Sequence, residues 1–313
     1  MGARYLLYSS LTRVMDAAER IRLLKREKNA LILAHNYCYP AVQDVADHVG
    51  DSLGLSIIAS NAKEDVIVFC GVSFMAESAK ILNPSKKVLI PEPEAHCPMA
   101  SMCAADQLET YKKKNPGVSI AGYVNSTASS KAEMDICCTS SNAVKAVASL
   151  KEKKVLFVPD RNLGAYAASK LPDKDIELWG GYCPIHHGIT EENILSMKEK
   201  HPKAVVLAHP ECRPPVLKLA DHIGSTERIL NIIGELDANE FIIATESGMR
   251  HRLEKMWPGR RFYFVDNAVC ITMKMTTLNS VLRCLETEGT EIVLEKKVID
   301  AAYVPLKRMI EIK

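Results

Sequence analysis

The sequence predicts an α/β fold: three similar three-layer αβα domains with parallel sheets around a pseudo-threefold axis, and an active site at the centre. Three observations support this prediction. Short apolar runs alternate with helical patterns, the order strand, helix, strand, helix, strand occurs three times, and the copies follow one another at a nearly constant period. Parallel strands need crossover connections, usually helices, so the alternation indicates parallel sheets.

Each repeat opens with a short apolar run whose last residue carries a ring. The runs cover residues 29–35, 118–123 and 204–209, and their ends are spaced by 88 and 86 residues. Runs of this kind, bounded by turn residues, are typical of buried parallel strands. Active sites of parallel sheets collect at such strand ends. The candidates at or just beyond them are His35, Tyr37, Tyr123, Asn125, His209 and Glu211.

Hydroxyl residues precede the first helical pattern of each repeat. They are Ser52 before 53–59, Ser140 before 142–150, and Ser225 with Thr226 before 229–233. Helix capping alone would explain each of them, because Ser and Thr are preferred at that position. Three helix amino termini aimed at one centre would also offer N–H groups and positive dipole ends to a carboxylate or phosphate. We therefore expect an anionic substrate.

The rest of each repeat supplies two more strands, one more helix and a cysteine. Second strands are predicted at 66–70, 155–159 and 241–245, second helices at 74–82, 165–171 and 249–256, and third strands at 88–90, 176–179 and 261–265. Cys97, Cys183 and Cys270 follow, spaced by 86 and 87 residues. The predicted domains are 1–97, 98–183 and 184–284. Segment 285–313, with a helix over 298–312 that packs back on the first repeat, completes the first domain.

Composition narrows the classes of function. The 40 basic and 38 acidic residues give a net charge of +2 and no long basic tract, so we expect no nucleic-acid partner. No apolar run approaches the roughly 20 residues of a membrane-spanning helix. Residues 1–13 lack a signal-peptide core, which favours the cytoplasm, and Met15 is a second candidate start.

Ten cysteines without an export signal favour thiol or metal chemistry over disulfides. No Cys-x-x-Cys pair has a matching partner, so metal ligands must come from distant points of the chain. Three thiolates leave one coordination position open, and in a 4Fe-4S cluster the unligated iron would act as a Lewis acid. A closed zinc site completed by His96, His186 or His187 is the alternative. The cysteines predicted to be core residues are Cys38, Cys70, Cys103, Cys137, Cys138, Cys212 and Cys284.

Motifs along nearly the whole chain resemble one enzyme family. They include Ala34-His-Asn-Tyr37, Gly50-Asp-Ser52, His96-Cys-Pro-Met-Ala100, Tyr123-Val-Asn125, Thr139-Ser-Ser-Asn-Ala143, Pro159-Asp-Arg-Asn-Leu163, His209-Pro-Glu211, Ile223-Gly-Ser-Thr226, Ala244-Thr-Glu246 and Met273-Lys-Met275. In these motifs the chain resembles the iron-sulfur quinolinate synthase A family. Ser101 and Ile271 depart from the family pattern, where an acidic residue and a proline are expected.

The resemblance implies a transferase of de novo NAD biosynthesis. It implies that the enzyme joins iminoaspartate to dihydroxyacetone phosphate and releases quinolinate, phosphate and two waters, with functional coupling to an enzyme that produces iminoaspartate. The implied cofactor is a 4Fe-4S cluster on Cys97, Cys183 and Cys270. His35, Ser52, Tyr123, Asn125, Ser140, His209, Ser225 and Thr226 would hold carboxylates and phosphate. Tyr37 and Glu211 would assist isomerisation and proton transfer, and His35 and Tyr123 are the other candidate catalytic residues. Glu211 would also bind substrate.

Two other functions fit the same residues. A cluster-dependent hydro-lyase for another carboxylic acid would need the same open iron and anion-binding helix ends. A non-catalytic protein that binds phosphorylated or dicarboxylate ligands would use the helix ends alone, and its cysteines would belong to the core. Product analysis distinguishes the hydro-lyase from a quinolinate synthase, and iron content distinguishes the non-catalytic binding protein from both enzymes.

Overall fold

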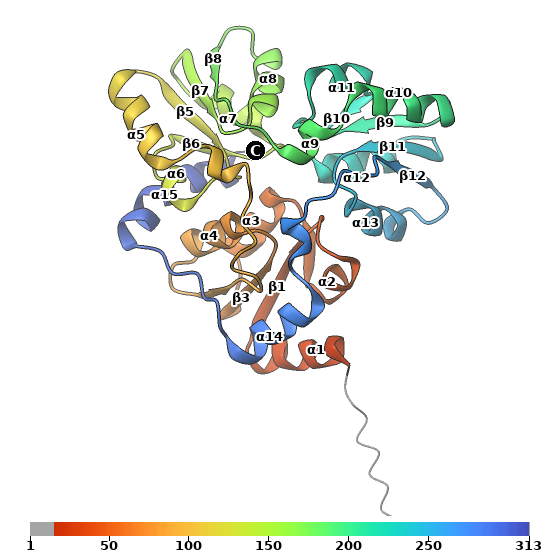
Figure 1. The fold of residues 1–313 in the computed structure, drawn as a ribbon. Coiled ribbons are helices and arrows are strands. Elements are labelled where there is room, and N and C mark those ends of the chain that lie inside the picture. Colours follow the sequence, from red (N-terminus) through yellow and green to blue (C-terminus); the bar gives the residue numbers. More distant parts are fainter. Residues whose placement is uncertain (1–15, 313) are drawn as a thin grey trace, which may run out of the picture.

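The computed structural model describes residues 16–312, so Met15 and the predicted start lie outside the described residues. Three αβα units surround a common centre (Figure 1). Each unit contains one four-stranded parallel sheet, and the strand orders are β2-β1-β3-β4, β6-β5-β7-β8 and β10-β9-β11-β12. The predicted fold class is confirmed.

The strands predicted from the sequence are present, and each unit has one more. The first sheet comprises β1 (Ala30–His35), β2 (His48–Gly50), β3 (Val66–Cys70) and β4 (Lys87–Leu89). The second comprises β5 (Ser119–Tyr123), β6 (Ile136–Cys138), β7 (Lys154–Val158) and β8 (Asp175–Leu178). The third comprises β9 (Val205–Ala208), β10 (His222–Ile223), β11 (Glu240–Ala244) and β12 (Arg261–Phe264). The missed strands, β2, β6 and β10, are two or three residues long, too short to show a hydrophobic pattern.

Helices surround the sheets. The first unit contains α1 (Ala17–Glu27), α2 (Pro40–Val45), α3 (Ser52–Ser60) and α4 (Ser73–Leu82). The second contains the short η1 (Ala100–Met102), then α5 (Ala105–Lys114), α6 (Ala128–Lys131), α7 (Ala143–Ser149) and α8 (Arg161–Lys170). The third contains α9 (Pro184–Gly188), α10 (Glu191–Lys200), α11 (Pro214–Leu219), α12 (Thr226–Glu235), α13 (Met249–Met256) and η2 (Thr272–Lys274). Among the residues described, no helix has the length and apolar character needed to cross a bilayer.

An aspartate just before the edge strand that pairs with the first strand (β2, β6 or β10) repeats in all three units. Its carboxylate accepts a hydrogen bond from a backbone N–H of the first strand, 15 residues earlier, and so fixes the edge strand beside the first one. The pairs are Asp47 with Ile32 (2.9 Å), Asp135 with Ile120 (2.7 Å) and Asp221 with Val206 (2.8 Å). The repeat seen in the sequence is therefore also a repeat of local hydrogen bonding.

The last two helices leave the third sheet. α14 (Leu278–Thr287) packs on α1 in the first unit, and its Val281, Cys284 and Leu285 belong to the hydrophobic cluster formed with β1 and β3 of that unit. α15 (Lys296–Glu311) was expected to pack on the first repeat, but it lies between two units, against α4 of the first and β6 and α6 of the second. The Asn142 amide donates to Met309 O (3.0 Å) and Arg308 donates to Asp135 O (2.6 Å). The domain boundaries at 97, 183 and 284 stay predictions.

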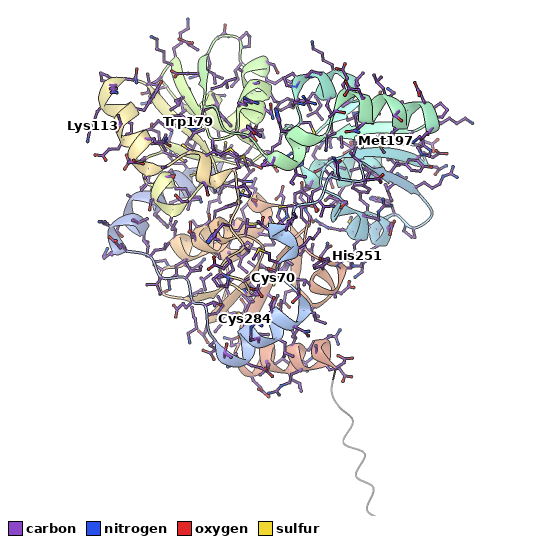
Figure 2. The ribbon with its side chains drawn as sticks, in the orientation of Figure 1. Cys70, Lys113, Trp179, Met197, His251 and Cys284 are labelled. Carbon is purple, nitrogen blue, oxygen red and sulfur yellow. The ribbon has the colours of Figure 1, made fainter. Side chains whose placement is uncertain are left out.

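Several cysteines serve as small core residues. In the first unit, Cys70 of β3 and Cys284 of α14 lie in the lower lobe of the molecule and belong to one hydrophobic cluster (Figure 2). The Cys38 thiol donates to Cys70 O at 3.3 Å, and the Cys212 thiol makes the equivalent bond to Ala244 O in the third unit at 3.3 Å. Burial raises the pKa of the Cys38 thiol to about 12. These thiols are neutral and already paired, as expected for structural cysteines.

Candidate active site

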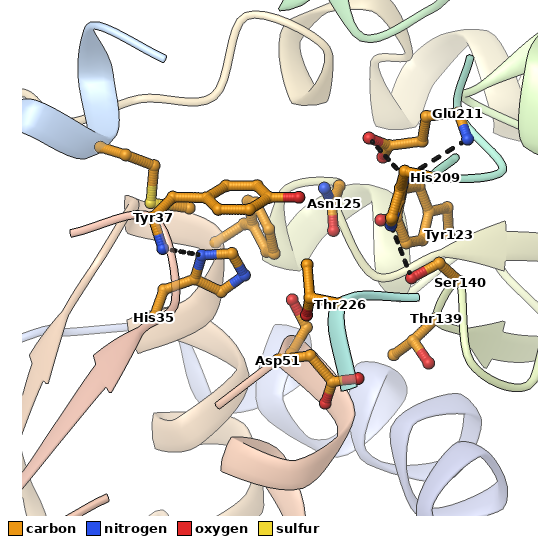
Figure 3. A pocket seen from close by; sticks show the side chains of 13 residues that line it. His35, Tyr37, Asp51, Tyr123, Asn125, Thr139, Ser140, His209, Glu211 and Thr226 are labelled. Atoms are coloured by element: carbon orange, nitrogen blue, oxygen red, sulfur yellow. Dashed lines mark hydrogen bonds and ion pairs between the residues drawn. The ribbon is translucent and has the colours of Figure 1, made fainter. Parts of the chain in front are cut away.

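A cavity lies where the three units meet. Figure 3 shows the side chains that line it converging from all three sheets. The first strands contribute the residues at and beyond their carboxyl ends, and three helix starts contribute hydroxyls. The lining consists of His35, Tyr37, Asp51, Ser52, Phe74, Tyr123, Asn125, Thr139, Ser140, His209, Glu211, Thr226 and Met273. Every candidate catalytic residue is in this set, and of the candidate substrate-binding residues only Ser225 lies outside it.

The structure confirms the predicted capping residue for α12 but not for α3 and α7. Ser225 caps α12, accepting from the Arg228 N–H at 3.3 Å. In α3 the cap is Asp51, whose carboxylate accepts from the Gly54 N–H at 2.8 Å, and Ser52 is the first helical residue. α7 begins after Asn142, with Ser140 two residues further upstream. The hydroxyls of Ser52 and Ser140 are therefore not needed for capping.

Two histidines at the ends of β1 and β9 have matching environments. Nδ1 of His35 accepts from the Tyr37 N–H (3.2 Å), and Nδ1 of His209 accepts from the Glu211 N–H (3.3 Å). Burial lowers the pKa of both imidazoles to about 3, with Lys274 adding to the shift at His35 and His186 at His209. Both rings are thus neutral at pH 7, with the hydrogen on Nε2. Nε2 of His209 lies 3.1 Å from the Ser140 hydroxyl.

The pKa values of Glu211, Tyr37 and Tyr123 are shifted from their usual ranges. Burial opposes ionisation of Glu211, but His186 and His209 outweigh it and hold the pKa of this carboxyl below its usual range. Burial, together with the Glu211 charge, raises the pKa of Tyr37 and of Tyr123. Glu211 is therefore ionised and can accept a proton, whereas both phenols keep theirs. Such divergent shifts are typical of acid–base groups.

Contacts between units fix several lining residues. The Asn36 side chain, fully buried in the first unit, donates to the Thr226 hydroxyl of the third unit at 2.8 Å. The Ser141 hydroxyl of the second unit donates to Asp51 at 2.7 Å, while burial raises the pKa of Asp51. The lining thus depends on how the units pack together.

A second cavity adjoins the first and is lined by the cysteines that recur in the three repeats. Cys97, Cys183 and Cys270 all line it. Burial raises the pKa of Cys97 to about 12, and Cys270 adds to this shift; burial and then Glu211 raise that of Cys183. Five residues line both cavities: Tyr37, Phe74, Asn125, Glu211 and Met273.

Buried carboxylates hold two of the three cysteine loops. Asp160 accepts from the Cys183 N–H at 2.9 Å and also caps α8. Glu246 accepts from the Cys270 N–H at 3.1 Å and pairs with Lys274 at 2.9 Å. Burial and Glu211 raise the pKa of Asp160 to about 7.

His186 brings a cysteine and an acid together. Its Nδ1 lies 3.2 Å from Sγ of Cys183 and 2.5 Å from Oε2 of Glu211. The ligand atoms of these three residues lie within 4.8 Å of one another, close enough for one metal ion. The other two histidines of the zinc alternative have different partners: His96 lies 3.0 Å from the Ser73 hydroxyl, and His187 contacts Arg161 (3.4 Å) and Asn162 (3.3 Å).

Four functional groups escaped the sequence prediction: Asp51, Asp160, Thr245 and Glu246. Asp160 and Glu246 stand just after β7 and β11, and a search for acids at the ends of second strands would have found both. Thr245 is fully buried between Tyr37 and His186, and Asp51 precedes a helix. Their roles depend on contacts with distant segments.

Fold and site together define a class: an α/β enzyme of three repeated units, with buried acid–base groups beside a candidate metal site of cysteine, histidine and glutamate. The family model of the quinolinate synthetase A protein matches residues 19–311. Curated relatives named quinolinate synthase include those of Methanosarcina barkeri (52% identical; 95% of this chain and 98% of the relative), Alkaliphilus metalliredigens (48%; 94% and 98%) and Aquifex aeolicus (45%; 96% and 95%). The chain belongs to the quinolinate synthetase A family, whose members are enzymes of NAD biosynthesis.

Proposed function

We propose that the chain condenses iminoaspartate with dihydroxyacetone phosphate and releases quinolinate, phosphate and two waters. One observation carries the proposal: three cysteines from three units line a cavity that shares Tyr37, Asn125 and Glu211 with a polar cavity at the strand ends. Such a juxtaposition suits a reaction that needs both a metal centre and proton transfer.

Cys97, Cys183 and Cys270 would hold a 4Fe-4S cluster. The donor set fits, because thiolates are the usual cluster ligands and these thiols face one cavity from three directions. A cluster with three protein ligands supplies an open iron, which acts as a Lewis acid toward a substrate oxygen. The raised thiol pKa of Cys97 and Cys183 implies that loading of the site releases protons.

The polar cavity would bind the carboxylates and the phosphate. α3 and α12 begin at its wall with Ser52 and Thr226, so their N–H groups and dipoles favour anions. The neutral His35 and His209 offer Nε2–H donors, and Tyr123, Asn125 and Ser140 add further polar contacts. Asn125 Oδ1 is buried without a partner among the described residues, as expected for a group that awaits a ligand. Ser225 would act indirectly, by capping α12.

Glu211 and Tyr37 would transfer protons, Glu211 as the base and Tyr37 as the acid. The ionised Glu211 would take a proton from a substrate carbon or nitrogen, since its Oε1 is buried and has no partner in residues 16–312. Tyr37, whose raised pKa keeps the phenol protonated, would donate at an oxygen, with His35 and Tyr123 orienting the substrate.

The location and partners follow from the chemistry. The cysteines are all free, which fits a reducing compartment, so we propose the cytoplasm. Iminoaspartate must come from an enzyme that produces an imino acid, and functional coupling to that enzyme is part of the proposal.

Product analysis tests the proposal against its rivals. Anaerobically reconstituted protein is incubated with enzymatically generated iminoaspartate and dihydroxyacetone phosphate, and quinolinate and phosphate are measured. We expect equal amounts of both, and loss of both in Glu211→Gln. Turnover of another hydroxy acid without quinolinate would favour the hydro-lyase, and binding without turnover would favour the binding protein.

A further inference from the structure

Lys131 is a fully buried lysine that the proposed reaction does not use. It is the last residue of α6 in the second unit and is among the largest side chains without exposed surface. Lysine is almost never fully buried unless its amino group is paired, because removing that group from water is costly. Within residues 16–312 no ion pair of 4.0 Å or less involves its Nζ. Other contacts must therefore explain its position.

The Lys131 amino group contacts one residue from each of two units. It donates to the Ser126 carbonyl in the loop that follows β5, and it lies 5.3 Å from the centre of the Phe74 ring of α4 in the first unit. Phe74 lines both cavities, whereas Lys131 lines neither. Burial lowers the pKa of the Lys131 amino group and Glu77 opposes this shift, but the group can donate in either protonation state. The amino group thus lies behind the cavity wall, where α4 and α6 pack together.

The Ser126 carbonyl belongs to the loop that carries Asn125 into the site (Figure 3). Asn125 lines both cavities, and no hydrogen bond within residues 16–312 holds its side chain, whose Oδ1 is buried. The backbone on either side must therefore set the direction of its amide. Upstream, the Val124 N–H donates to Cys138 O at 2.8 Å. Downstream, the bond from Lys131 holds the Ser126 carbonyl.

We propose that Lys131 is a positioning residue for substrate binding: from its place over the Phe74 ring, its amino group holds the Ser126 carbonyl and so directs the Asn125 amide into the site. The inference rests on the proposed role of Asn125 in binding a substrate carboxylate or phosphate. Lys131 lines neither cavity, so it acts through the loop without touching substrate. Ser126 is fully buried as well, and no water can replace the donor if it is removed.

Two substitutions at Lys131 test the bond to the loop. Lys131→Met keeps a long unbranched side chain and removes the donor, whereas Lys131→Gln keeps an N–H donor on a shorter side chain. The probe is quinolinate, whose dissociation constant is measured by equilibrium dialysis on reconstituted protein. We expect a rise of about 5- to 20-fold in Lys131→Met, against about 10- to 100-fold in Asn125→Ala, which removes a bond to a charged ligand outright. Lys131→Gln binds more tightly than Lys131→Met, and iron per chain is unchanged in all three.

Lys174→Met is the matched control. Lys174 also donates from Nζ to backbone carbonyls of the second unit, those of Leu150 (2.5 Å) and Glu152 (2.8 Å), but it lines neither cavity. Its substitution should leave the dissociation constant within about twofold of the parent, the usual limit for an independent site. A rise equal to that of Lys131→Met would overturn the inference, because the loss of any lysine-to-carbonyl bond would then have the same effect.

A double variant tests the route through Asn125. If Lys131 acts by directing the Asn125 amide, Lys131→Met with Asn125→Ala binds quinolinate no more weakly than Asn125→Ala alone. Effects that multiply would overturn the inference, because the lysine would then act on the ligand independently. Equal constants in Lys131→Gln and Lys131→Met would overturn it too, since the retained donor would then have no effect.

The remaining outcomes separate this inference from the proposed function. A merely structural role of Lys131 would lower the number of binding sites or the iron per chain and leave the dissociation constant unchanged. A constant within about twofold of the parent in Lys131→Met, or in Lys131→Gln should the first variant not fold, therefore overturns the inference. If Asn125→Ala binds weakly in the same experiment, the proposed function stands. A reconstituted parent that neither forms nor binds quinolinate overturns the proposed function itself.

Discussion

The three cysteine loops occupy equivalent places but are not held alike. In the second and third units a buried carboxylate two residues after β7 or β11 accepts the cysteine N–H: Asp160 for Cys183 and Glu246 for Cys270. In the first unit the equivalent position, two residues after β3, is Val72, and no hydrogen bond joins a described carboxylate to the Cys97 backbone. The three cysteines therefore occupy equivalent positions in the repeat, whereas the hydrogen bonds to their backbone N–H groups differ between the units. We expect the second and third loops to depend on single buried acids and the first to be insensitive to them.

Removal of Glu246 should have the largest effect. Glu246 is fully buried and pairs with Lys274, whose side chain is 14% exposed. Glu246→Ala removes the acceptor of the Gly248 and Cys270 N–H groups. It also removes the counter-charge of Lys274, whose ammonium keeps its bond to the Tyr37 carbonyl. We expect the free energy of unfolding to fall by about 3 to 5 kcal/mol, as when one partner of a buried pair is removed. Urea unfolding measures this.

An exposed ion pair provides the control for Glu246. Lys296 and Asp300 stand 2.6 Å apart on α15, with side chains 86% and 61% exposed. Asp300→Ala should change the free energy of unfolding by less than about 0.5 kcal/mol. Similar losses in the two variants would contradict the special status of the third loop.

Asp160→Ala should cause the second-largest loss in the free energy of unfolding. Asp160 accepts from the Asn162 and Leu163 N–H groups at the start of α8 (both 2.8 Å) and from the Cys183 N–H. Loss of the cap and one unpaired buried donor together cost roughly 2 to 3 kcal/mol. Thermal unfolding tests this, with Thr190→Ala, which removes the cap of α10 and leaves the cysteine N–H bonds intact, as control at about 1 kcal/mol. Equal losses of stability in Asp160→Ala and Thr190→Ala would mean that Asp160 contributes no more than an ordinary helix cap.

Gly248→Ala should disturb the third loop by crowding. An added Cβ would stand 2.6 Å from Oε2 of Glu246, 2.6 Å from Nζ of Lys274 and 2.8 Å from Cα of Tyr37. The backbone of Tyr37 cannot give way easily, so we expect a loss of about 1 to 2 kcal/mol in chemical denaturation. Gly188→Ala in α9, where nothing lies within 4 Å, is the control and should be neutral or slightly stabilising.

The smallest effect should come from a partly exposed acid at the end of α14. Glu288 pairs with Lys28 and Lys87, both at 2.5 Å, and their hydrogen bonds lower its pKa to about 2. A lowered carboxyl pKa gives stability that is present above the unfolded value near 4.5 and is lost as pH falls toward 2. The parent should therefore exceed Glu288→Gln slightly in stability at pH 6 and match it near pH 2. A gap that persists near pH 2 would refute the ion-pair origin.

The sequence predicted the first strands, the cysteine positions and the meeting of His35, Tyr123 and His209, because each recurs at one period and burial makes the strands apolar. It did not predict the supports of the site. Asp160 and Glu246 have no counterpart in the first unit, and the Thr245 hydroxyl contacts Tyr37 and His186, which are distant in the chain. Contacts of this kind depend on how the units pack, which no local pattern records.

The three-cysteine cluster is the central claim, and metal content tests it most directly. Iron and acid-labile sulfide are measured per chain after anaerobic reconstitution in the parent, in Cys97→Ser, Cys183→Ser and Cys270→Ser, and in Cys103→Ser as the buried control. We predict about four of each in the parent and in Cys103→Ser, with loss in all three ligand variants. A parent that binds a single zinc ion dependent on Cys183, His186 and Glu211, or no iron at all, would contradict the account.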